Sequence, residues 1–202
     1  MTLAGESIYI IGSGGFGSEV LQWAIDSGYS VEGFVDDNAR ELGKKEVDVI
    51  LPSEMRSGIR AVIAIGNPFK RRDVAKKLSK VDFATIVHPT CVIGSRVALS
   101  PGCIVCPNVV LTTNITIGAH AHLNLATTVG HDCVIGDYFT TAPKVAISGN
   151  SEIDDCVYFG TNSCIIEKKK VASGVVIGAA ACVVKDICEP GTYVGAPAKR
   201  IR

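Results

Sequence analysis

A strict period of six residues runs through the second half of the chain. From Val87 to Val183 every sixth residue falls on one register, and 16 of these 17 positions are apolar, with Thr141 the polar exception. A helix repeats every 3.6 residues and a strand every two, so neither alone produces a period of six. A short strand followed by a corner does, when the chain coils into a three-sided prism. The pattern therefore predicts a solenoid of a little over five coils.

Small residues recur where this solenoid needs corners. The residue four positions after the aliphatic one is small or β-branched, which suits the inside of a tight corner. The residue directly after the aliphatic one is often glycine. Glycine tolerates backbone angles that a Cβ forbids, so we expect such angles at these positions. The glycines are Gly94, Gly118, Gly130, Gly136, Gly160 and Gly178.

Alternating strands and helices are predicted before residue 85. The apolar segment 7–11 predicts a strand that leads into a glycine-rich loop and then a helix ending near residue 28. Further strands are expected at residues 31–35, 47–51 and 61–65, and a second helix at 69–80. This order is typical of a βαβ arrangement. The apolar face of the first helix is expected to hold Val20, Leu21, Ala24 and Ile25.

The glycine-rich loop and the acids after the second strand predict a nucleotide site. Glycines let a backbone approach a phosphate closely at a helix N-terminus, where the helix dipole favours negative charge. An acid at the end of the second strand can bind a ribose hydroxyl or a base. The predicted binding residues are Gly12, Ser13, Gly14, Gly15, Phe16, Asp36, Asp37, Gly66 and Asn67.

The spacing of Gly12, Gly14 and Gly17 also matches the dinucleotide motif G-x-G-x-x-G. A dinucleotide fold needs two mononucleotide halves, and the segment before the solenoid is long enough for one. We therefore favour a single nucleotide, such as the nucleoside diphosphate of an activated sugar. A tight turn without any ligand is the alternative.

Composition excludes several functional classes. Twenty basic and twenty acidic residues balance, so nothing indicates a nucleic-acid surface or insertion into a membrane. We find no signal-peptide pattern and no bilayer-spanning apolar run, and we expect a cytoplasmic protein with reduced cysteines. Cys103 and Cys106 form a C-x-x-C without a second pair, which favours packing over a zinc site.

The chain as a whole resembles the hexapeptide-repeat sugar acetyltransferases. The resemblance rests on the G-x-G-G-x-G loop, on Leu123-Asn124 followed by Gly130-His131-Asp132-Cys133-Val134-Ile135-Gly136, and on the segment 195–200. It implies an α/β, half-Rossmann-like βαβ domain over residues 1–84 that binds a nucleotide-sugar. An all-β left-handed parallel β-helix over residues 85–202, with a coenzyme A-contacting tail, would follow. The likeness is strongest to enzymes that N-acetylate nucleotide-linked 4-amino sugars of the bacillosamine and perosamine type.

His131 is the predicted general base of that reaction. An amino sugar is largely protonated near neutral pH, and imidazole titrates in the range needed to take its proton. The amine can then attack the thioester of acetyl-CoA directly, without an acyl-enzyme, while a backbone N–H at a corner stabilises the oxyanion. Asp132 can orient the ring, although adjacent residues on a strand point to opposite faces. Asn124 belongs to the same motif and is expected to contact the substrate.

The resemblance also implies a homotrimer that binds acetyl-CoA as co-substrate between neighbouring solenoids, without a metal. Glycine and alanine at successive corners would accommodate the pantetheine arm, and basic residues of the tail would meet phosphates or adenine. The predicted coenzyme A-binding residues are Gly160, Asn162, Gly178, Ala179, Ala180, Pro197, Lys199 and Arg200.

Two departures from the family pattern concern the acceptor. Phe16 stands where the loop usually holds a histidine, and Thr140 replaces a second histidine of the family, which often lies near the sugar. Thr141, next to it, breaks the aliphatic register, so we expect a local distortion there. Which nucleotide and which sugar are bound is left open.

Other functions remain as alternatives. A sialic acid-type sugar O-acetyltransferase would use the same base on a hydroxyl, and a non-catalytic trimer would only bind the nucleotide-sugar. His120 and His122 raise the possibility of a γ-carbonic anhydrase, but no loop leaves the repeats to build a zinc site. His88 is expected to have a structural or interface role.

Overall fold

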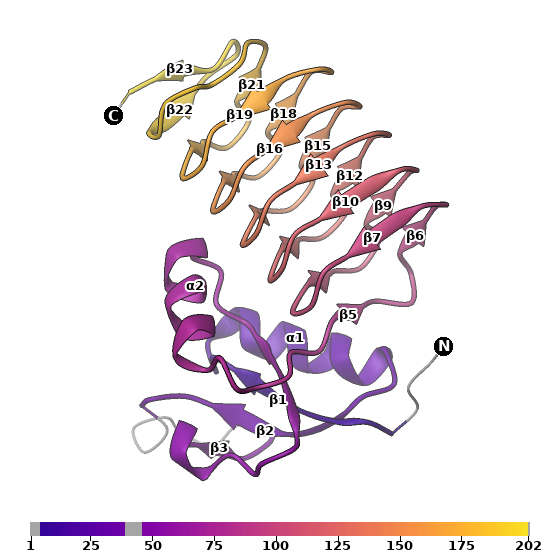
Figure 1. The fold of residues 1–202 in the computed structure, drawn as a ribbon, viewed down its shortest axis with the longest axis vertical. Helices are drawn as coiled ribbons and strands as arrows, with labels where there is room; N and C mark the ends of the chain where they lie inside the picture. Colours follow the sequence, from indigo (N-terminus) through magenta and orange to yellow (C-terminus); the bar gives the residue numbers. More distant parts are fainter. Residues whose placement is uncertain (1–4, 39–45, 202) are drawn as a thin grey trace.

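The computed structural model describes residues 5–38 and 46–201, which form an N-terminal α/β part and a coiled solenoid standing on it (Figure 1). Neither α-helix of these residues is long and apolar enough to cross a lipid bilayer. All eight cysteines are free, and Cys103 and Cys106 are both buried in the core, as expected of packing residues.

The N-terminal part is a four-stranded parallel sheet with the strand order β3-β2-β1-β4. Strand, helix and strand follow one another as predicted, and the second helix ends at Lys77 rather than at residue 80. The elements are β1 (Ser7–Ile11), α1 (Gly15–Asp26), β2 (Ser30–Val35), β3 (Val49–Ile50), the 3-10 helix η1 (Pro52–Glu54), β4 (Arg60–Ile63) and α2 (Pro68–Lys77).

One predicted core position of α1 is wrong. Val20, Leu21 and Ala24 are buried as expected, but Ile25 is 51% exposed and Trp23 is buried instead. Residues 20, 23 and 24 follow the i, i+3, i+4 spacing of a single helix face, and Ile25 lies off that face.

The solenoid is a three-sided parallel β-helix in which each strand pairs with the strand one coil later, as Ile117 does with Ile135. Side 1 holds β5 (Ile86–Val87), β8 (Ile104–Val105), β11 (His122–Leu123), β14 (Thr140–Thr141), β17 (Tyr158–Phe159), β20 (Val176–Ile177), β22 (Thr192–Val194) and the antiparallel β23 (Lys199–Arg200). Side 2 holds β6 (Val92–Ile93), β9 (Val110–Leu111), β12 (Thr128–Val129), β15 (Ala146–Ile147), β18 (Cys164–Ile165) and β21 (Cys182–Val183). Side 3 holds β7 (Val97–Leu99), β10 (Ile115–Ile117), β13 (Val134–Ile135), β16 (Glu152–Ile153) and β19 (Lys170–Val171).

The six-residue register is the core of this prism. From Val105 to Val183 every residue of the register is buried, and Thr141 is among them. In the first coil Val87 and Leu99 are only partly buried, and Ile93 has 39% of its surface exposed. It lies in β6, the first strand of side 2, so no coil covers it from below.

The corner glycines serve a different purpose from the one predicted. None of the six adopts a left-handed backbone. From Ile93 to Ile177 that conformation falls on the residue three positions after each inward one, such as Asp132 with φ 58°. The glycines lie where successive coils approach closely. A Cβ on Gly130, for example, would lie 2.6 Å from the backbone N of Gly149.

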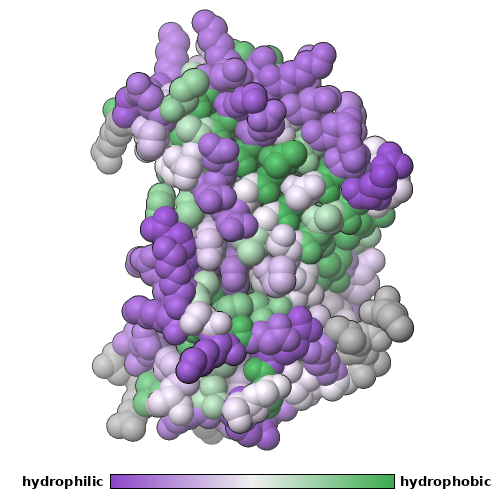
Figure 2. Space-filling model, viewed as in Figure 1, coloured by the Kyte–Doolittle hydropathy of each residue, from purple (hydrophilic) through white to green (hydrophobic). Residues whose placement is uncertain are grey.

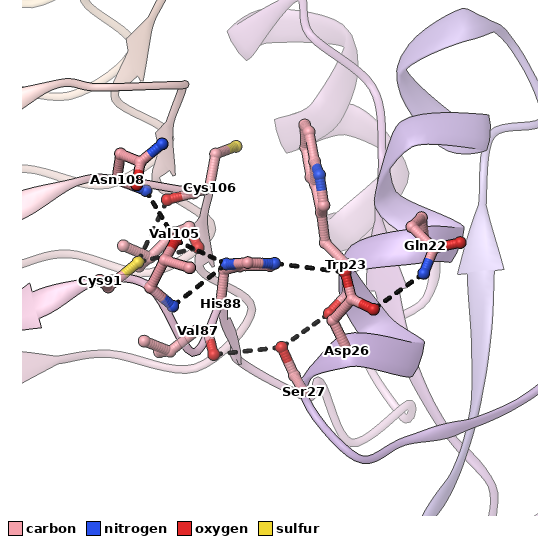
Figure 3. A network of polar contacts seen from close by, with 11 residues as sticks. Gln22, Trp23, Asp26, Ser27, Val87, His88, Cys91, Val105, Cys106 and Asn108 are labelled. Atoms are coloured by element: carbon pink, nitrogen blue, oxygen red, sulfur yellow. Dashed lines mark hydrogen bonds and ion pairs between the residues drawn. The ribbon is translucent and has the colours of Figure 1, made fainter.

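The α/β part covers the beginning of side 1 (Figure 1). The outward residues Ile86 and Ile104 are fully buried in the same apolar cluster as Ile8 and Phe34 of the sheet. Polar contacts add to this junction (Figure 3): His88 Nε2 lies 3.3 Å from Asp26 Oδ2, and the Ser27 hydroxyl donates to the Val87 carbonyl at 3.1 Å. His88 thus lies in the structural position that was expected for it.

Candidate functional site

The glycine-rich loop connects β1 to the first turn of α1. Gly12 has a φ of +102°, and a Cβ on Gly17 would lie 2.1 Å from the Gly12 carbonyl oxygen, so the turn requires glycine at both positions. Asp36, at the end of β2, accepts hydrogen bonds from the Ser13 N–H at 3.1 Å and the Ser13 hydroxyl at 2.8 Å. The acid that was expected to contact the nucleotide therefore also holds the loop in place.

Hydrogen bonding sets the charge of this acid. Burial raises the pKa of Asp36, but hydrogen bonds from the Asn38 N–H and from the Ser13 hydroxyl and N–H outweigh it, so the pKa lies below its ordinary value. Asp36 is consequently ionised at neutral pH.

A cavity of about 220 Å³ lies beside the loop, which we term the loop cavity. Gly12, Asp36 and Asp37 line it from the loops that follow β1 and β2, while Ile65, which follows β4, and Lys77 of α2 also line it. Lys77 was not predicted. Its only signal in the sequence is its place on the helix that follows Gly66-Asn67, and it supplies a cation opposite the two acids.

A second cavity, of about 330 Å³, lies where the α/β part meets side 1, and we term it the junction pocket. It brings together three predicted substrate-binding residues, namely Phe16 and Gly66 from the α/β part and Asn124 from the solenoid. His122 and Thr140 also line it, and no lining residue is an acid, a lysine or an arginine. The phenyl ring of Phe16 lies 5.3 Å from the His122 ring.

Thr141 alters the backbone ladder next to this pocket. The Asn124 N–H donates to the Thr141 side-chain oxygen at 2.8 Å, whereas the equivalent Cys106 N–H donates to a backbone carbonyl, that of Leu123. The Thr127 hydroxyl also bonds the Thr141 hydroxyl, at 2.8 Å. The expected distortion is therefore present but is confined to one hydrogen bond, since Thr141 still pairs with Phe159.

His131 and Asp132 form a hydrogen-bonded pair at the corner between side 2 and side 3. His131 Nδ1 lies 2.7 Å from Asp132 Oδ2, and both side chains are about half exposed. The two side chains do not point apart, as they would on a strand, because Asp132 has a left-handed backbone. The other carboxylate oxygen accepts a hydrogen bond from the Asn114 amide.

This arrangement fixes the imidazole ring. The Asn114 amide first, and His131 second, hold the pKa of Asp132 below its usual range, so the carboxylate is ionised at neutral pH. An ionised carboxylate at Nδ1 favours a proton on that nitrogen and leaves Nε2 as the free base. The pair thus has the geometry of an oriented general base.

Gly149 lies against the face of the His131 ring, one coil further on. A Cβ on Gly149 would lie 2.8 Å from His131 Nε2 and 2.9 Å from Cε1, closer than ordinary contact. The equivalent corner positions in other coils are Ser95, Thr113 and Glu167, all of which carry a Cβ. Glycine at this position therefore makes room for the ring.

The coenzyme A-binding residues expected in the solenoid lie at the corner between side 1 and side 2. Gly160, Gly178 and Ala179 meet there on successive coils, because a Cβ on Gly160 would lie 2.6 Å from the Ala179 N. Asn162 and Ala180 adopt left-handed corner angles.

The expected tail residues lie next to the strand that follows that corner, because the Ala198 N–H donates to the Cys182 carbonyl at 2.7 Å. Pro197 and Lys199 line a cavity of about 300 Å³ together with Lys185, and Arg200 pairs with Glu189 at 2.6 Å.

A single chain keeps these groups apart. His131 lies at the corner between sides 2 and 3, whereas the junction pocket opens on side 1, and Asn124 and Gly160 lie at the corner between sides 1 and 2. Asn124 and His131 are seven residues apart in the sequence but stand at different corners of the same coil.

His120 and His122 are buried beneath the α/β part. His122 Nε2 lies 2.9 Å from the Ile63 carbonyl oxygen, and the His120 ring stacks on Tyr138. Burial lowers the pKa of His120 to about 4 and takes that of His122 well below its ordinary value. Within residues 5–38 and 46–201 no cluster of three metal-ligating side chains forms.

Both parts of the chain have relatives among known proteins. The PglD N-terminal domain family matches residues 7–78. Over 105 residues the chain is 37% identical to the GDP-perosamine N-acetyltransferase of Escherichia coli O157:H7, an alignment that covers 51% of this chain and 48% of that protein. The chain therefore spans about half, or less, of the length of the curated relatives it matches.

Two solved structures resemble the chain along nearly its whole length. PerB from Caulobacter crescentus, in complex with CoA and GDP-perosamine, has a TM-score of 0.89 and 26% identity, and the match covers 97% of each chain. WeeI from Acinetobacter baumannii AYE has a TM-score of 0.89 and 30% identity, and the match covers 98% of this chain and 100% of that one. The likeness thus includes the α/β part, the solenoid and the order in which they are joined.

Proposed function

The chain belongs to the hexapeptide-repeat sugar acetyltransferase family, and we propose that it is an acetyl-CoA-dependent N-acetyltransferase of a nucleotide-linked 4-amino-4,6-dideoxy sugar. The observation that carries the proposal is the His131–Asp132 pair, an exposed imidazole oriented by a carboxylate 2.7 Å away. The names of the similar proteins support the substrate class, since one is a GDP-perosamine N-acetyltransferase and another was solved with CoA and GDP-perosamine.

His131 acts in this mechanism as the general base. Nε2 takes a proton from the sugar ammonium or from the amine as it attacks, while Asp132 holds Nδ1–H and stabilises the imidazolium that forms. The amine nitrogen bonds to the thioester carbonyl carbon, and the tetrahedral intermediate collapses with release of the coenzyme A thiolate. The thiolate then takes up the proton. A backbone N–H at a corner of the coil is suited to stabilise the oxyanion.

Residues 1–84 bind the nucleotide end in this proposal. Gly14, Gly15 and Phe16 present backbone N–H groups at the start of α1, and Lys77 adds a positive charge to the loop cavity for the diphosphate. Asp36 and Asp37 face the ribose or the base. The sugar extends into the junction pocket, whose uncharged lining, with Phe16 in place of a histidine, suits a deoxy sugar with a methyl group.

Residues 85–202 bind acetyl-CoA and supply the base. Gly160, Asn162 and Gly178–Ala180 form a corner of small side chains along which a pantetheine arm can lie. Pro197 and Lys199, next to Lys185, make a basic cavity for the phosphates or the adenine. Arg200 contributes its positive charge at the same end.

A homotrimer brings these groups together. Since His131 and the junction pocket lie at different corners of one coil, the corner between sides 2 and 3 of one chain must meet the corner between sides 1 and 2 of another. The outward residues of side 2 fit such a contact, because none is charged: Val92, Val110, Thr128, Ala146, Cys164 and Cys182. Apolar surface gathers over the coils, between hydrophilic regions at both ends of the molecule (Figure 2). Light scattering should give three times the 21.2 kDa of one chain.

The test replaces His131 with alanine and follows thiol release from acetyl-CoA with UDP-, GDP- and dTDP-linked 4-amino sugars. We expect the variant to lose turnover by about 10²-fold or more while it keeps its oligomeric state and its affinity for the nucleotide-sugar. Glu167→Ala, at the equivalent corner two coils later, is the matched control and should turn over normally. Undiminished turnover by His131→Ala would contradict the mechanism.

A further inference from the structure

Arg71 is a buried cation to which the proposed mechanism assigns no role. It lies in α2 with 0% of its surface exposed, where the α/β part meets the solenoid. Its guanidinium donates to the carbonyls of His120 at 2.9 Å, Ile65 at 2.6 Å, Gly66 at 3.2 Å, Tyr138 at 2.8 Å and Phe139 at 3.3 Å, and to the Thr140 hydroxyl at 2.6 Å.

These contacts leave the guanidinium no capacity for a ligand. A guanidinium has five N–H groups in a fixed fork, and the six acceptors engage Nε and both terminal nitrogens of Arg71. Every acceptor is a carbonyl or a hydroxyl, and no carboxylate of the described residues joins them. A buried charge without a counter-ion is costly, and apolar residues usually fill such a space at lower cost. Stability alone is therefore a poor reason for arginine here.

The acceptors come from both sides of the junction pocket. Ile65 and Gly66 belong to the turn between β4 and α2, and Asn67 caps that helix by accepting the Lys70 N–H at 3.0 Å. Tyr138, Phe139 and Thr140 lead into β14 of the solenoid. Gly66 and Thr140 both line the junction pocket, so one guanidinium connects its two walls.

We propose that Arg71 is a positioning residue that fixes the Gly66-Asn67 turn against β14 and so sets the width of the junction pocket for the acceptor sugar. This inference rests on the proposed function, in which the sugar occupies that pocket. Arg71 acts through the backbone it holds and does not touch the substrate. The coenzyme A corner, on the other edge of side 1, lies outside its contacts.

The test compares Arg71→Lys with Arg72→Lys. Lysine keeps the charge but has one nitrogen with three N–H groups, which cannot replace the six contacts that the three guanidinium nitrogens make. Arg72 is the next residue of α2. Its guanidinium lies over the Phe69 ring and 3.9 Å from Cys156 Sγ, and it does not line the pocket. For Arg71→Lys we expect the KM for the nucleotide-sugar to rise by about tenfold or more, with the KM for acetyl-CoA within about twofold of the parent value. Arg72→Lys should change neither.

A second readout needs no substrate. In Arg71→Lys, hydrogen exchange should quicken in residues 64–68 and 138–142, with protection elsewhere in the solenoid unchanged. If the lysine variant does not fold, Arg71→Met, which leaves no buried charge, is measured in the same way. An unchanged KM for the nucleotide-sugar, or an equal rise in both KM values, overturns the role of Arg71. Failure of the parent protein to turn over any amino sugar overturns the proposed function instead. The exchange pattern then still tests whether Arg71 fixes the Gly66-Asn67 turn against β14.

Discussion

Gly149→Ala is expected to disable His131, the proposed general base, without changing the binding of the nucleotide-sugar. The added methyl group would lie 2.8 Å from His131 Nε2, 2.9 Å from Cε1 and 3.1 Å from Cδ2, so it would press on the face of the ring. Gly149 does not have a positive φ, so alanine brings no backbone strain of its own. The perturbation is therefore confined to the position of the imidazole.

The size of the effect follows from these distances. Ordinary contact begins at 3.4 Å, so the ring must move by roughly 0.6 Å or turn away from Asp132. A misplacement of about 1 Å at a reacting group can cost about 10²-fold in rate. We therefore expect kcat to fall by roughly 10- to 100-fold, with both KM values nearly unchanged.

Steady-state thiol release gives kcat and both KM values, and thermal unfolding tests the steric argument independently. In the parent background, Gly149→Ala should lower the melting temperature. In the His131→Ala background the same change should be nearly neutral, because the ring it meets is gone. A Gly149→Ala enzyme with kcat within twofold of the parent, or with the same destabilisation in both backgrounds, would refute the reasoning.

Three other substitutions or conditions test the site and its support. Asp132→Asn should lower kcat by about tenfold or more, because an amide does not stabilise the imidazolium; an unchanged kcat would remove Asp132 from the mechanism. Ser13→Ala should weaken nucleotide binding measured by calorimetry, because the loop loses the 2.8 Å hydrogen bond to Asp36; equal affinity would mean that this bond does not shape the site. The free energy of unfolding should fall as the pH drops from about 6.5 towards 4. The pKa of His120 is about 4 in the folded chain, so the unfolded chain binds protons first in that range. Calorimetry measures the melting temperature over this pH range, and a constant value would contradict the buried, neutral state of His120.

Much of the architecture follows from the sequence, because a period of six residues indicates a solenoid and no other regular structure. Each inward residue is separated from the next by one strand and one corner, so burial imposes a period that no helix or isolated strand shares. Ile93 departs from it only because the first coil has no neighbour below. In the α/β part, Ile25 was wrongly predicted to lie on the buried face of α1. The apolar residues of this helix allow two adjacent faces, and packing against the sheet determines which of them is buried.

The site was less predictable, because it depends on contacts between coils. The corner glycines were expected to adopt backbone angles that a Cβ forbids. In the structure they instead allow close contact between stacked coils, which the sequence of one coil does not show. Asp132 was expected to orient the His131 ring although neighbours on a strand point to opposite faces, and its left-handed corner angle is what brings the two side chains together. Arg71 gave no signal at all, since a basic residue on a polar helix looks exposed until the solenoid covers it.

We propose above all that the chain transfers acetyl from acetyl-CoA to the amine of a nucleotide-linked sugar. The most direct measurement incubates the parent protein with acetyl-CoA and matched pairs of UDP-, GDP- and dTDP-linked 6-deoxy sugars, one bearing a 4-amino group and the other a 4-hydroxyl. The products are then weighed by mass spectrometry. We predict one acetyl group added to the amino member of at least one pair, with free thiol released in equal amount and no change in the hydroxyl member. Acetylation of the hydroxyl member, or of neither, would contradict the account.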